Sequence, residues 1–171
     1  MARVMLLAQR PVAIVTANRF EAKLVSDVLR TAGAARATMI SDSREALTVL
    51  ATDASNIVLV DLDATPVSGL DFVRALRRNR ASRSRRALVF LLTRKLTASV
   101  VEACRLSGAN AVIGMPVSNA TLLTTIKKVI ASPRPFVEEE GYIGPCRRAG
   151  IISAGRGSGR RRSDGGARGA A

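Results

Sequence analysis

The sequence contains no histidine and no tryptophan, and only two of its 171 residues are cysteine. Without histidine, the chain lacks the residue on which serine-type triads, many general bases and most zinc sites depend. Two cysteines are too few for a disulfide framework, which favours a cytoplasmic protein. No run of 18 apolar residues occurs, and Gln9, Arg10 and Pro11 interrupt the first apolar patch. We therefore expect neither a membrane span nor a secretion signal.

Acidic residues are scarce in two stretches of a chain whose net charge is +14. Residues 74–86 hold seven arginines and no acid, and residues 147–171 hold seven arginines and one acid. The first stretch has two interpretations, a solvated helix end with its loop or a docking patch for an acidic partner. The Gly-, Ser- and Arg-rich end predicts a disordered basic tail over residues 151–171. Such a tail favours salt-dependent contact with nucleic acid.

Short apolar runs alternate with segments of helical period. The expected strands are residues 12–15, 37–40, 57–60, 87–92 and 111–114. The composition and polar boundaries of most of these runs, residues 37–40 fitting least well, are typical of strands buried on both faces of a parallel sheet. Helices are expected to begin near residues 18, 43, 68, 97 and 118, where Asn, Ser or Thr can act as caps. In the first helix, the buried face is expected to hold Phe20, Leu24, Val25, Val28 and Leu29.

Strict alternation with short connections predicts an open, doubly wound α/β domain with a five-stranded parallel sheet. The expected organisation is a domain over residues 10–132, a Pro-containing extension over 133–150 and the tail over 151–171. No helical unit long enough for a helix-turn-helix follows the domain. Ligands of such folds lie at the carboxyl ends of the strands. The candidate site is therefore expected at residues 16–18, 61–63, 93–95 and 114–116.

Three residues at those strand ends, together with a glycine after the third strand, follow the order of a known family. Asp61 ends the third run, Gly69 follows it, Thr93 ends the fourth run, and Pro116 closes "GANAVIGMP". In this order they resemble response-regulator receiver domains, the CheY-like phosphoacceptor modules of two-component signalling. The resemblance covers residues 10–132 and implies a flavodoxin-like (βα)₅ fold. It also implies that Asp61 is the phosphoacceptor and Thr93 the switch residue.

Several positions depart from the pattern of that family. Thr16 and Ala17 stand where the resemblance implies two acids that hold Mg²⁺, Met115 replaces a lysine, and Val112 replaces an aromatic residue. Attack of a carboxylate on a phosphoryl donor gathers negative charge, which a metal and a cation normally offset. We therefore expect no cofactor, and the sequence argues against ordinary Mg²⁺-dependent phosphorylation of Asp61.

Nearby residues offer a compensation. Asp63 lies close to Asp61 in the chain, and Arg94 and Lys95 lie on the loop that faces the acceptor in receiver folds. We hypothesise that Lys95 or Arg94 pairs with Asp61 or Asp63 and stands in for the missing lysine or metal. The alternative is that Asp61 only caps a loop or pairs with a base.

The expected function is that of a stand-alone, divergent receiver in a phosphorelay, acting through protein–protein contacts. Its expected partner is a histidine kinase or a phosphotransfer protein, and the downstream target stays open. One alternative is a pseudo-receiver that binds its partner without phosphate. Another is a protein that associates with nucleic acid through its arginine-rich tail. Because no catalytic group set accompanies Asp61, we do not expect an enzyme.

Overall fold

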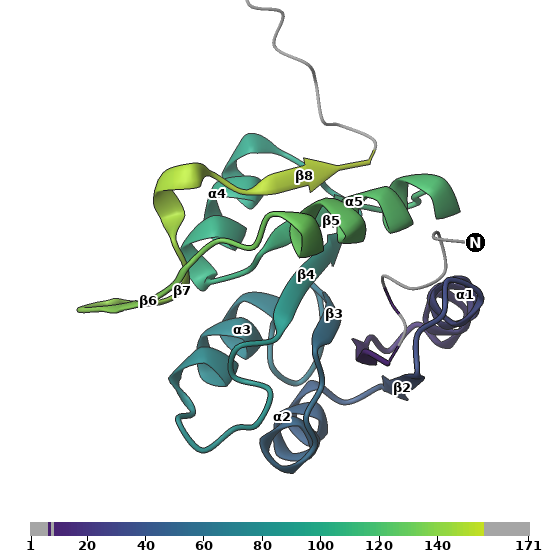
Figure 1. The fold of residues 1–171 in the computed structure, drawn as a ribbon, viewed down its shortest axis with the longest axis horizontal. Helices are drawn as coiled ribbons and strands as arrows, with labels where there is room; N and C mark the ends of the chain where they lie inside the picture. Colours follow the sequence, from purple (N-terminus) through teal and green to yellow (C-terminus); the bar gives the residue numbers. More distant parts are fainter. Residues whose placement is uncertain (1–6, 8, 156–171) are drawn as a thin grey trace, which may run out of the picture.

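Strands and helices alternate along the chain as the sequence predicts. The computed structural model describes residues 7 and 9–155, and Figure 1 shows their arrangement. The alternating elements are β1 (Pro11–Val15), α1 (Arg19–Thr31), β2 (Arg36–Ile40), α2 (Ser43–Thr52), β3 (Ile57–Asp61), α3 (Gly69–Arg78), β4 (Leu88–Thr93), α4 (Ala98–Ser107), β5 (Ala111–Gly114) and α5 (Asn119–Ala131). They are followed by β6 (Phe136–Glu139), β7 (Tyr142–Pro145), the 3₁₀-helix η1 (Arg147–Ala149) and β8 (Ile152–Ala154).

The main sheet is parallel throughout and has the strand order β2-β1-β3-β4-β5-β8. Its first five strands confirm the predicted doubly wound α/β fold. From β1 the chain first adds β2 on one side and then crosses to add β3 on the other. The carboxyl ends of β1 and β3 therefore flank the point at which the winding reverses, which is where such folds bind ligands.

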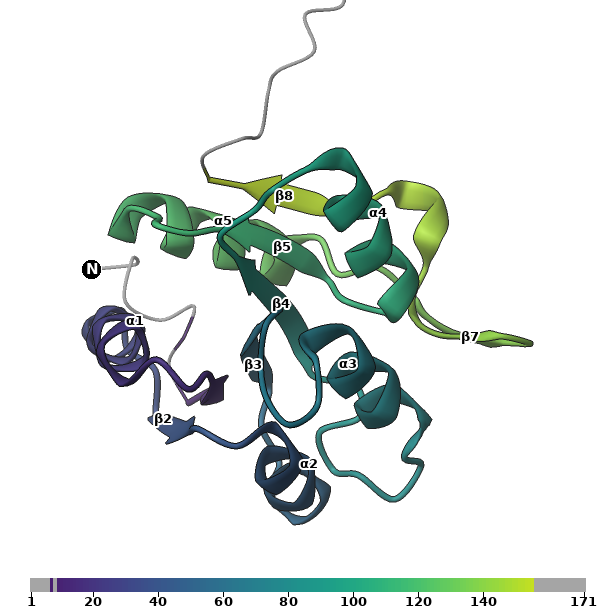
Figure 2. The same ribbon diagram turned by 180° about the vertical axis from the view of Figure 1, so that it is seen from behind.

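Two apolar layers enclose the sheet, because the side chains of a strand alternate between its faces. Val12, Ile14, Leu59 and Phe90 join the cluster that α1 and α5 cover. Residues of the opposite alternation, such as Val58, join the cluster beneath α2, α3 and α4. Figure 2, which views the molecule from behind, shows α2, α3 and α4. Strands β1, β3, β4 and β5 are therefore buried on both faces, as their nearly continuous apolar runs predict. The edge strand β2 is more open, and its Met39 is 53% exposed.

Helix caps follow the sequence closely. The side chains of Asn18, Ser68, Thr97 and Ser118 accept hydrogen bonds from backbone amides in the first turns of α1, α3, α4 and α5. In α2, Asp42 is the cap instead of the expected Ser43. The buried Ser43 hydroxyl accepts a hydrogen bond from the amide of Val67, 2.8 Å away, and so ties α2 to the loop before α3.

The expected buried face of α1 needs a correction. Val25, Val28 and Leu29 are buried, but Phe20 is 80% exposed and Leu24 is 48% exposed. The stripe that faces the sheet also contains Ala22 and Ser26 and is therefore rotated away from Phe20 and Leu24. Two large apolar side chains of α1 thus face outward.

The residues after α5 also differ from expectation, because they add structure to the domain. β6 and β7 form an antiparallel hairpin, which projects at the left edge of Figure 1. β8 then pairs with β5 in parallel and becomes the sixth strand of the sheet. The boundary expected at residue 151 is corrected, since Ile152–Ala154 form a strand. The remaining part of the expected tail, residues 156–171, lies outside the described residues.

One arginine fastens this extension to the sheet. The Arg134 guanidinium donates hydrogen bonds to the carbonyl oxygens of Ala109 and Asn110, which precede β5, at 3.1 and 3.0 Å. It also donates to the carbonyls of Cys146 and Gly150, at 3.2 and 2.5 Å. Burial lowers the pKa of Arg134. A charged donor of four bonds, placed between two segments, fixes where the chain returns to the β5 edge.

No helix within residues 7 and 9–155 has the length and apolar character that a membrane span requires.

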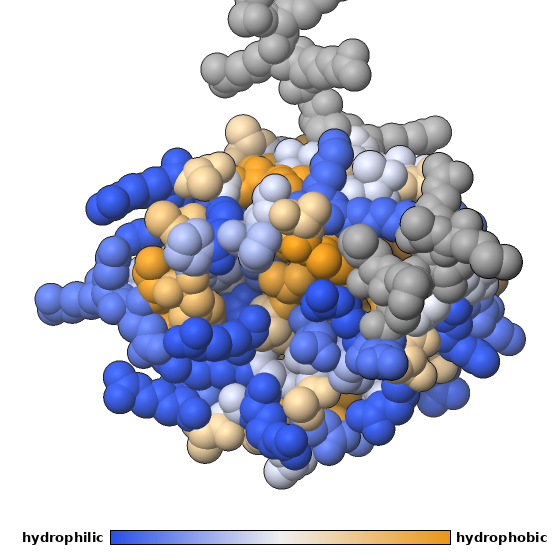
Figure 3. Space-filling model, viewed as in Figure 1, coloured by the Kyte–Doolittle hydropathy of each residue, from blue (hydrophilic) through white to orange (hydrophobic). Residues whose placement is uncertain are grey.

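Figure 3 shows one face of the molecule, on which hydrophilic side chains project at the side of the β6–β7 hairpin.

Candidate functional site

The carboxyl ends of β1 and β3 bring Thr16 and Asp61 together. Thr16 Oγ1 donates a hydrogen bond to Asp61 Oδ2 at 3.2 Å, and the amide of Asp63 donates to Asp61 Oδ1 at 3.0 Å. Asp61 is 8% exposed and is the one buried carboxylate among the described residues. Each of its oxygens thus has a donor, which holds the carboxylate in one orientation at the edge of the sheet.

The loop after β3 fixes this position through a close backbone approach. A Cβ atom at Gly69 would lie 2.5 Å from the carbonyl oxygen of Asp61 and 2.8 Å from the Cα of Leu62. Any larger residue would push the start of α3 away from the loop. The amide of Gly69 also donates to the Leu62 carbonyl at 2.9 Å. The sequence spacing between Asp61 and Gly69 therefore reflects a packing requirement at the site.

Arg94 is the basic residue that reaches Asp61. Its Nη1 lies 3.8 Å from Asp61 Oδ2, and its Nη2 lies 3.0 Å from Glu21 Oε2. Lys95, the other candidate, is exposed, and its backbone amide donates to Thr93 Oγ1 at 3.1 Å. Asp63 is likewise exposed and contributes its amide to the carboxylate of Asp61. Of the two bases considered from the sequence, Arg94 therefore has the geometry of a counter-ion.

Thr93 ends β4 beside this group and is 3% exposed. Its hydroxyl lies 3.4 Å from the carbonyl oxygen of Lys95, so it faces the β4–α4 loop. A switch role for Thr93 stays a prediction.

The positions that depart from the receiver pattern have ordinary structural surroundings. Ala17 is exposed. Met115 packs against the cluster covered by α1 and α5, and its amide donates to the Thr93 carbonyl at 2.7 Å. Val112 is fully buried in the opposite cluster. Packing accounts for Met115 and Val112.

The residues at Asp61 fit a magnesium ion poorly. Mg²⁺ in proteins takes oxygen ligands, usually one or two carboxylates together with waters and substrate phosphate. Within the described part of the chain, no group of three or more His, Cys, Asp or Glu side chains is arranged to hold a metal. The guanidinium of Arg94 already lies 3.8 Å from Asp61 Oδ2.

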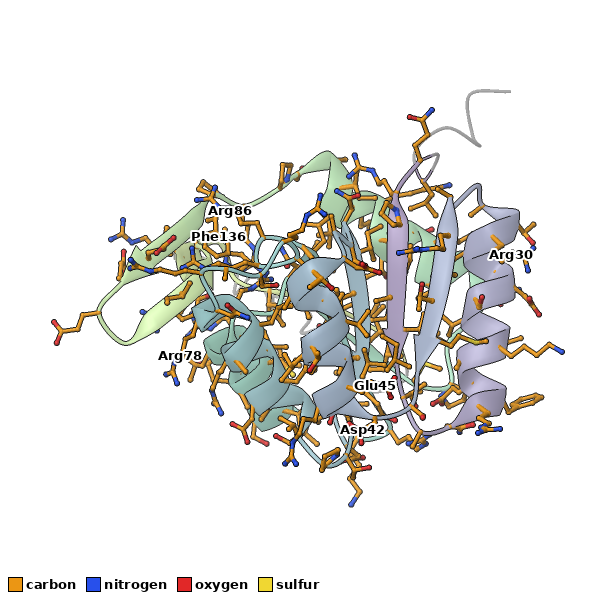
Figure 4. All side chains as sticks on the ribbon, turned by 90° about the horizontal axis from the view of Figure 1, so that it is seen from below. Arg30, Asp42, Glu45, Arg78, Arg86 and Phe136 are labelled. Carbon is orange, nitrogen blue, oxygen red and sulfur yellow. The ribbon has the colours of Figure 1, made fainter. Side chains whose placement is uncertain are left out.

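The arginines of residues 74–86 separate into structural and exposed ones. Arg77 is 1% exposed, and the Arg85 side chain donates to Glu138 Oε1 at 2.7 Å. Arg86 stacks on the ring of Phe136, with its guanidinium carbon 4.9 Å from the ring centre, as Figure 4 shows. Arg78 projects into solvent from the end of α3. Part of the stretch therefore holds the β6–β7 hairpin, and docking remains a hypothesis for its exposed part.

The two cysteines differ in burial. Cys104 is fully buried in α4, and burial raises the pKa of its thiol to about 11. Cys146 is partly exposed at the start of η1. Both are free thiols.

Sequence reasoning did not identify Glu21 as a residue of this site. Its amide does bind Asn18 Oδ1 at 3.1 Å, but its carboxylate also anchors Arg94. The available signal was its position in the first turn after β1, at the functional edge of the sheet.

Comparisons with known proteins find a partial sequence match and similar folds. No family model matches the chain. The sensory/regulatory protein RpfC of two strains of Xanthomonas campestris pv. campestris is 32% identical over 95 residues, which are 56% of this chain. The chain covers 13% of the length of that relative.

Solved structures of receiver domains superpose on most of the chain. The chemotaxis response regulator CheY4 of Vibrio cholerae matches with a TM-score of 0.65 and 23% identity, over 71% of this chain and 99% of that one. A putative response regulator from Chloroflexus aurantiacus gives a TM-score of 0.67 and 20% identity, over 72% and 99%.

A third structure comes from a receiver domain with a metal. The receiver domain of the sensor histidine kinase PA1611 of Pseudomonas aeruginosa, which has a magnesium ion in its active-site cleft, gives a TM-score of 0.65 and 22% identity, over 73% of this chain and all of that one. These matches confirm the resemblance that Asp61, Gly69, Thr93 and Pro116 indicated in the sequence. This chain has the fold of a CheY-like response-regulator receiver domain.

Proposed function

We propose that the chain is a divergent receiver domain of a two-component phosphorelay, with Asp61 as its phosphoacceptor. The observation that carries this proposal is the buried carboxylate of Asp61 at the winding reversal of a receiver fold, the one buried carboxylate in the part of the chain that the structure describes. Thr16, which follows β1, and Thr93, which ends β4, lie at the same edge of the sheet. Its role is signalling from the cytoplasm through protein contacts, and it is not an enzyme acting on small molecules.

The partner that supplies the phosphoryl group is a histidine kinase or a phosphotransfer protein. Such a partner has to contact the start of α1 and the β4–α4 loop, which carry Glu21 and Arg94 beside Asp61. Phe20, at 80% exposure, and Leu24 lie on α1 beside Glu21. Exposed apolar side chains next to a polar reacting group are typical of a docking surface whose centre becomes buried in the complex.

Phosphodonor labelling tests this proposal. The full chain is incubated with a small acyl phosphate and its mass is measured intact, beside the variants Asp61→Asn and Asp53→Asn. Asp53 is a matched control, because it is an exposed aspartate paired with Arg36 at 3.4 Å. Wild type and Asp53→Asn should gain one phosphoryl group, whereas Asp61→Asn should gain none. Equal labelling of all three proteins would contradict the assignment of Asp61.

A second candidate is a pseudo-receiver that binds its partner without phosphate. The ion pair between Arg94 and Asp61 favours it, because the carboxylate already has a counter-ion in the unphosphorylated chain. This candidate predicts no mass gain in the same assay for any of the three proteins.

A further inference from the structure

We propose that Arg94, held in place by Glu21, is the resident cation of the Asp61 site and makes phosphoryl transfer to Asp61 independent of Mg²⁺. The inference rests on the proposed function of Asp61 and adds how the charge of the reaction is balanced.

Five residues form a closed ring of interactions around the site. Arg94 contacts both Asp61 and Glu21 through different nitrogens of one guanidinium. The Glu21 amide donates to Asn18 Oδ1, the Asn18 amide donates to Thr16 Oγ1 at 3.1 Å, and Thr16 Oγ1 donates to Asp61. Because the ring joins the start of α1, the end of β3 and the β4–α4 loop, the fold itself positions Arg94.

The side chains of this ring differ in their exposure to solvent, and the most exposed of them is the cation. The side chains of Glu21 and Asp61 are 15% and 11% exposed, whereas that of Arg94 is 50% exposed. Arg94 is therefore anchored on its inner side and open on its outer side, from which a phosphodonor must approach. A planar guanidinium can bind two phosphoryl oxygens at once, which a single ammonium cannot do in the same way.

The charge balance of the step shows what Arg94 would do. An oxygen of the Asp61 carboxylate attacks the phosphorus of an acyl phosphate, and the bond from phosphorus to the acyl oxygen breaks. The acyl carboxylate leaves with the electron pair, and Asp61 becomes an aspartyl phosphate dianion. Arg94 offsets the negative charge that builds up on the phosphoryl oxygens during this transfer.

The same geometry disfavours a metal at this place. A divalent ion bound to Asp61 Oδ2 would lie close to the positive charge of Arg94, and the two would repel each other. Asp61 would also be its one buried carboxylate ligand. The chain thus places a side-chain cation, the guanidinium of Arg94, beside Asp61.

The first experiment measures the rate of acyl phosphate labelling with Mg²⁺ and with a chelator. Wild type should label at the same rate in both conditions. Arg94→Ala should label at least about tenfold more slowly, because losing one donor to a developing oxyanion costs roughly 10²–10³ in rate in a well-studied hydrolase. Arg94→Lys should recover part of the rate, and Glu21→Gln should reduce it while keeping a hydrogen-bond acceptor for Arg94.

Arg36→Ala is the matched control, since Arg36 also forms an exposed ion pair, with Asp53. It should label like wild type, and thermal unfolding of each variant checks that the fold is intact. Labelling that requires Mg²⁺ and ignores Arg94→Ala would overturn this inference and leave the proposed function standing.

A calorimetric titration of the wild-type chain with Mg²⁺ alone tests separately whether the chain binds the metal. No binding at sub-millimolar concentration is the expected result. Sub-millimolar binding would overturn the inference whatever the labelling shows. Absence of labelling in every condition would reject phosphoryl transfer to Asp61, and with it both the proposed function and this inference.

Discussion

Replacing Arg77 by methionine should destabilise the whole domain, because this residue joins three segments from within the core. Arg77 Nε donates to the Gly108 carbonyl at 3.1 Å, and Nη2 donates to Asn110 Oδ1 at 3.1 Å. Nη1 donates to the carbonyls of Arg85 and Ala87 at 2.6 and 2.8 Å. Methionine fills a similar volume but leaves all four acceptors without this donor.

Two opposing effects set the size of the change. A hydrogen bond from a charged donor contributes ~1.5–3 kcal/mol, so four contribute about 8 kcal/mol. Burial opposes this gain, since it lowers the pKa of the Arg77 guanidinium to about 9. Methionine avoids this cost of burying a charge, so the loss of stability is smaller than the sum of the four hydrogen bonds. We therefore expect Arg77→Met to lower the free energy of unfolding by about 3 kcal/mol.

Urea denaturation followed by circular dichroism measures this change. In a chain of this size, the expected loss corresponds to a fall of about 6–12 °C in Tm. Arg86→Met is the control, because exposed Arg86 stacks on Phe136 and such a contact is worth about 0.5–1 kcal/mol. A free energy of unfolding for Arg77→Met within about 1 kcal/mol of wild type would refute the reasoning about Arg77.

Three further predictions follow from the extension and the thiols. Deleting residues 133–171 should lower Tm and promote self-association, because it uncovers the β5 edge; an unchanged Tm would contradict the part given to β8. Deleting residues 156–171 should abolish any retention of nucleic acid in a low-salt gel shift, and retention by the shortened chain would reject that segment as the cause. An alkylating reagent at neutral pH should modify Cys146 and spare Cys104, because the Cys104 thiol is buried and burial raises its pKa to about 11. Mass spectrometry of the native chain that finds Cys104 modified would show that α4 opens.

Much of the domain could be predicted because its signals are local. Short apolar runs and capping side chains at Asn18, Ser68, Thr97 and Ser118 fixed the order of elements without knowledge of their packing. The rule that parallel strands present ligands at their carboxyl ends then brought the site residues to one edge.

The buried face of α1 and the strand β8 could not be predicted, because they depend on contacts between distant segments. Helical period groups residues on a common face, but it did not show that the face of α1 containing Ala22 and Ser26 is the buried one, which leaves Phe20 outside. β8 has three residues in a Gly- and Ser-rich context, and its pairing depends on Arg134, which lies well before it in the chain.

The choice between Arg94 and Lys95 could not be made from the sequence either. A loop has no period that would indicate the direction of a side chain. The contact of Arg94 with Glu21 joins two residues 73 positions apart, and it is visible only when α1 and the β4–α4 loop are placed together.

The direction of β8 decides where the end of the chain is tethered. Because β8 runs parallel to β5, the backbone reaches Gly155 beside Gly114, at the same rim of the sheet as Asp61. A chain that stopped after α5 would instead have ended at the opposite rim. A fluorescent reporter placed at Gly155 would consequently lie at the rim that carries Asp61, where it could sense a partner's arrival.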